Sequence, residues 1–161
     1  MCVIIDVNVA GLVFRESPDP NFLPVFHWLH DANKDGRIVY GGQLARELIG
    51  NENVRRFLLA LQRAGRASSF PEHVIQNESV KVVEFGICRS NDIHIIALAR
   101  VSGARTLCSS DQDLHADFKN RQLISEPRGH VYQRNTKTHR KFLRHTSSCK
   151  MGLRKYAIKQ H

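Results

Sequence analysis

The chain contains 161 residues, of which 42% are hydrophobic, and these values are typical of one folded domain with a short extension. Globally disordered proteins are poorer in apolar residues, and no stretch here approaches the ~18 consecutive apolar residues of a membrane-spanning helix. The apolar N-terminal stretch has no basic residue before Arg15 and is interrupted by Asp6, so it does not resemble a signal peptide. We therefore expect a cytoplasmic protein without a membrane partner.

The net charge of +9 is concentrated near the C-terminus. Residues 1–133 contain 15 Lys and Arg residues, which 15 Asp and Glu residues balance, whereas residues 134–161 contain nine basic and no acidic residues. We therefore expect a neutral domain over 1–133 and a basic tail over 134–161, which either binds an anionic partner such as RNA or is only solvated. The first five basic residues of this tail are Arg134, Lys137, Arg140, Lys141 and Arg144.

Short apolar runs predict strands, and apolar residues at helical spacing predict helices. In chain order we expect a strand at 2–6, a helix at 21–32, a strand at 37–40, helices at 42–49, 51–65 and 92–102, a strand at 105–109, a helix at 111–119, and closing strands at 122–125 and 130–133. Residues 66–90 are ambiguous, since VKVVEF suits a strand by composition, but its spacing favours a helix. This alternation predicts an α/β sandwich with a mainly parallel sheet.

Four acidic residues occur near expected strand ends or helix starts. Asp6 follows the first strand, Asp111 follows the strand at 105–109, Asp92 begins a helix, and Glu47 lies in the helix after the second strand. Ligands of open parallel sheets bind beyond the carboxyl ends of the strands, so these carboxylates are expected to converge there. Because grouped carboxylates repel one another, a cation would stabilise them, and an oxygen-only ligand set favours Mg²⁺ or Mn²⁺. For any single acid, a solvated helix face is the alternative.

Four short motifs resemble those of the PIN-domain nucleases, which include the VapC-type toxins of bacterial toxin–antitoxin pairs. The motifs are Asp6-Val7-Asn8, Ala45-Arg46-Glu47-Leu48-Ile49, Ser90-Asn91-Asp92 and Ser109-Ser110-Asp111-Gln112-Asp113-Leu114. Their order, residue types and spacings are similar to the family pattern over residues 1 to about 132. The resemblance implies a three-layer α/β/α sandwich and an endoribonuclease that uses Mg²⁺ or Mn²⁺ to hydrolyse phosphodiester bonds in single-stranded or structured RNA.

The resemblance also implies roles for individual residues. Asp6, Glu47, Asp92 and Asp111 would be the catalytic metal-site acids, Asp113 an auxiliary ligand, Asn8 a group that orients Asp6 or contacts substrate, and Ser109 a hydrogen-bond donor behind the metal ligands. A toxin of this family would be restrained by a small antitoxin protein, and many members form homodimers. His94 and His115 would either contact substrate or be satisfied surface residues.

Two other functions remain open from the sequence. One is a non-enzymatic RNA-binding regulatory module in which the basic tail drives binding, and the other is a metal-dependent phosphatase. The segment 31–38 is similar to the first part of an EF-hand calcium loop, but the twelfth position holds Gly42 in place of the bidentate Glu. We therefore expect a polar turn there.

Overall fold

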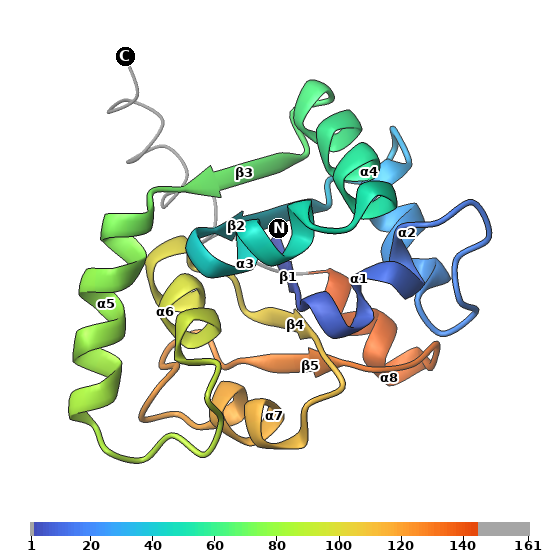
Figure 1. Cartoon of the computed structure of the whole chain (residues 1–161). Helices are drawn as coiled ribbons and strands as arrows, with labels where there is room; N and C mark the ends of the chain where they lie inside the picture. Colours follow the sequence, from blue (N-terminus) through green and yellow to red (C-terminus); the bar gives the residue numbers. More distant parts are fainter. Residues whose placement is uncertain (1, 145–161) are drawn as a thin grey trace.

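The computed structural model describes residues 2–144, which form alternating strands and helices (Figure 1). The strands are β1 (Cys2–Ile5), β2 (Arg37–Gly41), β3 (Ala67–Phe70), β4 (Thr106–Cys108) and β5 (His130–Tyr132). The helices are α1 (Val7–Val13), α2 (Leu23–His30), α3 (Gly42–Ile49), α4 (Glu52–Arg63), α5 (Glu72–Glu84), α6 (Ile93–Ser102), α7 (Gln112–Lys119) and α8 (Lys137–Arg140), followed by the 3₁₀ helix η1 (Lys141–Leu143).

The five strands form one sheet in the order β3-β2-β1-β4-β5, and every neighbouring pair is parallel. Strand β1 is central, and all four of its residues are buried. A parallel sheet is covered on both faces, so its central strands need continuous apolar sequence. The runs CVII in β1 and TLC in β4 meet this requirement.

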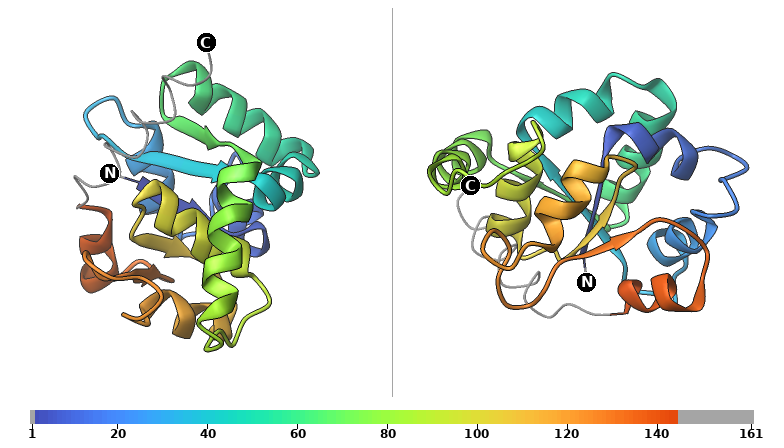
Figure 2. Two further views of the ribbon diagram at one scale, coloured as in Figure 1. Left: turned by 90° about the vertical axis from the view of Figure 1, so that its left-hand side faces the viewer. Right: turned by 90° about the horizontal axis from the view of Figure 1, so that it is seen from below.

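Helices cover both faces of the sheet and give a three-layer α/β/α arrangement. Helices α1, α2 and α4 lie on one side, and α5, α6 and α7 on the other (Figures 1 and 2). Helix α3 contacts α1 and α4 as well as α5 and α6, so it joins the two helical layers. Helix α6 ends at Gly103, whose φ of 78° gives the left-handed conformation that commonly terminates a helix.

The predicted α/β class with a parallel sheet is confirmed, and three details of the element assignment change. Helix α1 occupies residues for which the sequence analysis assigned no element. The ambiguous segment 66–90 contains the expected helix, α5, but also the edge strand β3. The strand expected at 122–125 is wrong, because these residues form turns that bury Leu123 and Ile124 before β5 begins.

The first part of the basic tail packs along β5. The Thr106 hydroxyl donates a hydrogen bond to the Phe142 carbonyl oxygen (2.7 Å), and the Phe142 ring stacks on His130 with ring centroids 4.6 Å apart. Leu143 is buried. Residues up to 144 therefore lie beside the outer edge of the sheet, where an uncovered strand would expose unpaired backbone groups. Tail residues 145–161 lie outside the described residues. None of the helices within 2–144 combines the length and apolar character needed to cross a bilayer.

Candidate active site

The strand order places the candidate site at the carboxyl ends of the central strands of the sheet. From β1 the chain moves outward to β2 and β3, and then returns to β4 on the other side of β1. The connections that follow β1 and β4 therefore diverge, and in open α/β sheets this is the position where a ligand-binding crevice forms. Asp6 follows β1 directly, and Ser109 and Asp111 follow β4. Topology alone thus brings together residues more than 100 positions apart.

Ser109 links the two acids of this crevice. Its hydroxyl donates a hydrogen bond to Oδ2 of Asp6 (2.9 Å) and accepts one from the backbone N–H of Asp111 (3.1 Å). Asp6 and Ser109 are both buried, with exposed fractions of 4% and 2%. Oδ1 of Asp111 accepts the N–H groups of Asp113 and Leu114, which fixes this carboxylate at the start of α7. The geometry agrees with the hydrogen-bonding role that the resemblance implies for Ser109.

A buried acid that the sequence analysis missed holds the loop before Asp92. The Asp117 carboxylate is 2% exposed and accepts hydrogen bonds from the backbone N–H groups of Arg89 (2.9 Å) and Ser90 (2.8 Å). The Ser90 hydroxyl then accepts the N–H of Asp92 (2.9 Å). Asp92 is thereby placed as the N-cap residue of α6, although its side chain forms no capping hydrogen bond. Nothing in the sequence around Asp117 distinguishes it from a solvated helix residue.

Glu47 approaches the same crevice from α3, which follows the strand on the other side of β1. Its Oε1 accepts a hydrogen bond from the Gln43 side-chain amide one turn earlier in the helix (2.9 Å). The charge of Glu47 contributes to the raised pKa of both Asp6 and Asp92, so this half-buried acid lies within electrostatic range of both. The four predicted acids therefore occupy one region.

Burial and neighbouring charge shift the pKa values of two of these acids. Burial raises the pKa of Asp6, and the charges of Asp92 and Glu47 raise it further, against the opposing hydrogen bond from Ser109. Burial also raises the pKa of Asp92, as do Asp111 and Glu47, while His94 acts in the opposite direction. A hydrogen-bond contact between the carboxyl groups of Asp92 and Asp111 adds to this rise. Burial is the largest cause for both acids and the neighbouring carboxylates add to it, so the ionised forms are disfavoured here.

His94 lies among these acids. Burial lowers its pKa, whereas the charges of Glu47, Asp92 and Asp6 act in the opposite direction. Its Nε2 atom is buried and has no hydrogen-bond partner within the described chain. A buried nitrogen without a partner is costly and uncommon, so its presence beside the acids suggests that a ligand completes this part of the site.

The donor chemistry of the four acids fits a hard divalent cation. All four offer carboxylate oxygens, the ligands that Mg²⁺ and Mn²⁺ prefer, and none forms a salt bridge with another residue of the segment 2–144. In the described chain, no three His, Cys, Asp or Glu side chains are arranged to enclose an ion. The four acids therefore fit a divalent cation in the type of their donor atoms and in their charge, and not in an enclosing geometry. The residues that would hold the ion are Asp6, Glu47, Asp92 and Asp111.

The remaining predicted side chains occupy different positions around the site. Asn8 is exposed, and its Oδ1 accepts the backbone N–H of Ser110 (3.3 Å), which ties α1 to the loop after β4. Asp113 is exposed in the first turn of α7, and its charge is not among those that shift the pKa of Asp6 or Asp92. His115 is buried and hydrogen-bonds the Ser109 carbonyl oxygen, so it supports the loop and does not lie at the surface.

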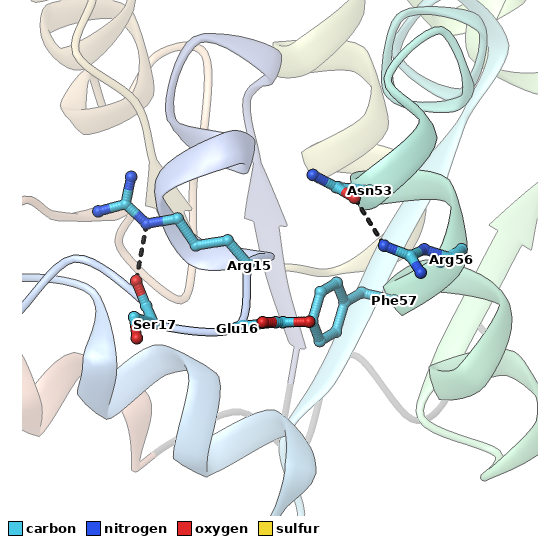
Figure 3. Close-up of a pocket in the computed structure, with 6 residues that line it drawn as sticks. All are labelled: Arg15, Glu16, Ser17, Asn53, Arg56 and Phe57. Carbon is cyan, nitrogen blue, oxygen red and sulfur yellow. Dashed lines mark hydrogen bonds between the residues drawn. The ribbon is translucent and has the colours of Figure 1, made fainter.

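A hollow of about 560 Å³ lies between the α1–α2 connection and α4 (Figure 3). The guanidinium groups of Arg15 and Arg56 lie on opposite sides of it, and the Phe57 ring lies at its border. Each guanidinium forms one local hydrogen bond, Arg15 to the Ser17 carbonyl oxygen and Arg56 to Oδ1 of Asn53 (both 2.8 Å). Glu16 also lines this hollow, so its carboxylate offsets part of the positive charge of the two arginines.

The five basic residues predicted to contact RNA are all exposed. Arg140 donates a hydrogen bond to Oδ1 of Asn135 (2.7 Å), and the others have no ion pair within the described chain. The strands are parallel, so the carboxyl end of β5 lies on the same side of the sheet as those of β1 and β4. Arg134 therefore follows β5 on the side of the sheet that carries the acids. Their contact with RNA stays a prediction.

No protein-family model, curated protein or solved structure matches this chain. The functional conclusion therefore depends on the chemistry of the site.

Proposed function

We propose that this protein is a metal-dependent endoribonuclease that hydrolyses phosphodiester bonds of single-stranded or structured RNA with Mg²⁺ or Mn²⁺. The observation that carries the proposal is that acids from separate elements act on one another at the carboxyl ends of the strands, where burial and then the neighbouring acidic charges raise the pKa of Asp6 and Asp92. The sequence resemblance to PIN-domain nucleases supports the same reaction.

Other residues of the chain hold the proposed catalytic acids in position. Ser109 orients Asp6, the α7 N-terminus fixes Asp111, and the Asp117-anchored loop places Asp92. A bound divalent cation would neutralise these carboxylates, lower the pKa of water and stabilise charge that develops on the phosphate oxygens. The protein supplies no serine or histidine nucleophile in this scheme, so its catalytic contribution is to hold charge and orient the phosphodiester.

The basic residues along β5 favour a second candidate, a non-enzymatic RNA-binding module. RNA would then bind through Arg134, Lys137 and their neighbours, and removal of divalent ions would leave binding intact. The first proposal extends to a cytoplasmic location, a small antitoxin partner and a homodimer, as the resemblance implies. A metal-dependent phosphatase would instead hydrolyse small phosphomonoesters and leave RNA intact.

One experiment separates these functions. Labelled RNA and p-nitrophenyl phosphate are incubated with the purified chain in EDTA, Mg²⁺ or Mn²⁺, alongside Asp6→Asn, Asp92→Asn and the exposed control Asp35→Asn. We expect RNA cleavage only with metal, a loss of about 10²–10³-fold in each site variant because one charge-stabilising group is removed, and an unchanged rate in Asp35→Asn. Full cleavage by the Asp6→Asn/Asp92→Asn double variant would refute the proposal, and salt-sensitive binding without cleavage would favour the second candidate.

A further inference from the structure

A separate hollow of about 280 Å³ lies directly beside the acids, among α3, α5 and the start of α6. Gln43 and Arg46 line it from α3 and precede Glu47 in the same helix, while Asn91 and Ile93 flank Asp92 in the sequence. The hollow is therefore built from the immediate neighbours of two proposed catalytic acids. A substrate whose phosphate reaches those acids would bring an adjoining group to this hollow.

The polar lining offers hydrogen-bonding groups that are only partly used. The side-chain amide of Gln43 donates to Glu47 (2.9 Å), and that of Gln76 donates to Glu72 (3.4 Å), so each retains its carbonyl oxygen as an acceptor. Asn91 is exposed, and its side-chain amide has no hydrogen-bond partner within the described chain. His94 also lines this space, although its unpartnered Nε2 atom is itself buried. Amides that carry a donor and an acceptor side by side match the edge of a nucleobase.

The charge and the apolar lining disfavour a phosphate in this hollow. The guanidinium of Arg46 is paired with the Glu72 carboxylate (2.6 Å), so the one arginine of the lining is already neutralised. The apolar side chains that complete the lining are those of Ile75, Ile93 and Val83. Val83 is 57% exposed, so its methyl groups are accessible at the border of the hollow. A flat, uncharged ring with hydrogen-bonding edges suits this combination of surfaces better than an anion.

We infer that this hollow binds the base of a nucleotide next to the phosphate held at the acids, and that Gln43, Gln76 and Asn91 set the base preference of the protein. The inference rests on the proposed function for its substrate class, RNA. Sequence-specific RNA recognition relies on splayed bases of single strands, which are hydrogen-bonded on their edges and packed on their faces. The amides supply the edge contacts, and the aliphatic side chains supply the face contact.

The test measures binding of fluorescent oligo(A), oligo(C) and oligo(U) to the full chain in EDTA, so that no RNA is cleaved. We expect the wild-type affinities for the best and worst base to differ at least ~5-fold, the low end of what one bidentate amide contact provides. Gln76→Ala and Asn91→Ala should reduce this difference to less than about twofold. Gln122→Ala, an exposed glutamine after the far end of α7, is the matched control and should leave it unchanged.

The outcomes distinguish this inference from the proposed function. Equal affinity for all three oligonucleotides, or discrimination that both variants retain, would overturn the inference even if the protein cleaves RNA. Base-selective binding that Gln76→Ala abolishes would support the inference even if no cleavage occurs with any metal, and the endoribonuclease proposal would then fail alone. Because Gln76 and Asn91 are exposed, loss of folding is not expected, and circular dichroism of each variant verifies this.

Discussion

Asp117 provides a direct test of how the fold positions Asp92. The Asp117 carboxylate is almost completely buried and accepts the backbone N–H groups of Arg89 and Ser90 at distances of 2.8–3.1 Å. The Asp117→Ala variant removes this acceptor and leaves two N–H groups without a partner in the protein. The loop that ends at Asp92 then loses its attachment to α7.

The magnitude follows from these hydrogen bonds. A hydrogen bond to a charged group contributes about 1.5–3 kcal/mol, so the loss of two predicts a free energy of unfolding lower by about 3–6 kcal/mol. The variant also no longer buries the charged Asp117 carboxylate, which offsets part of this loss. We therefore expect a free energy of unfolding lower by about 3 kcal/mol. For a chain of this length, that change corresponds to a Tm lower by about 6–12 °C. Asp117→Asn keeps one acceptor oxygen and should lose about half as much.

Urea unfolding at constant m-value and thermal unfolding measure this prediction, with the exposed Glu84→Ala on α5 as a control that should change stability by less than about 0.5 kcal/mol. RNA cleavage by Asp117→Ala should also decrease under conditions where the variant is folded, because Asp92 is displaced. An unfolding free energy within about 1 kcal/mol of wild type, with unchanged exchange protection at the amides of Arg89 and Ser90, would refute the reasoning.

Two further predictions concern charge. In EDTA, the raised pKa of Asp6 means that the folded chain binds this proton more tightly than the unfolded chain. The contribution of Asp6 to stability is therefore fully present below the ordinary carboxyl pKa and is lost as pH rises through the raised value, by about 1.4 kcal/mol for each pH unit that separates the pKa of Asp6 in the folded chain from that in the unfolded chain. Asp6→Asn should weaken this pH dependence and raise Tm at neutral pH. Mg²⁺ should stabilise the wild type but not the variant. Identical curves of Tm against pH for the wild type and Asp6→Asn would contradict this prediction. Replacing Arg134 and Lys137 by Gln should lower the slope of log K against log salt for single-stranded RNA by about 1.4, since each phosphate contact contributes about 0.7. An unchanged slope in a salt titration would show that these two residues do not contact the RNA.

The sequence predicted an element correctly where the spacing of its apolar residues matches the side that it buries. The run CVIID predicts a buried strand followed by an acid, and the structure has β1 followed by Asp6. The strong amphipathic pattern over 51–65 predicts a helix that the structure places at Glu52–Arg63, capped by the Asn51 side chain. The residues of β3, Ala67–Phe70, have little strand character of their own, and they are extended because β2 pairs with them. Pairing between distant segments is not encoded in a local pattern.

The sequence by itself determined the alternation of strands and helices, the parallel sheet and the acidic residues at the ends of elements, because burial periodicity and residue type are local properties. Tertiary structure alone decided which groups meet. The hydrogen bond from Ser109 to Asp6 spans 103 positions, and the one from Ser90 to Asp117 spans 27. The first of these contacts exists because β4 returns beside β1, and the second because α7 packs against the loop that precedes α6. Only the folded chain therefore shows that the isolated acids act on one another.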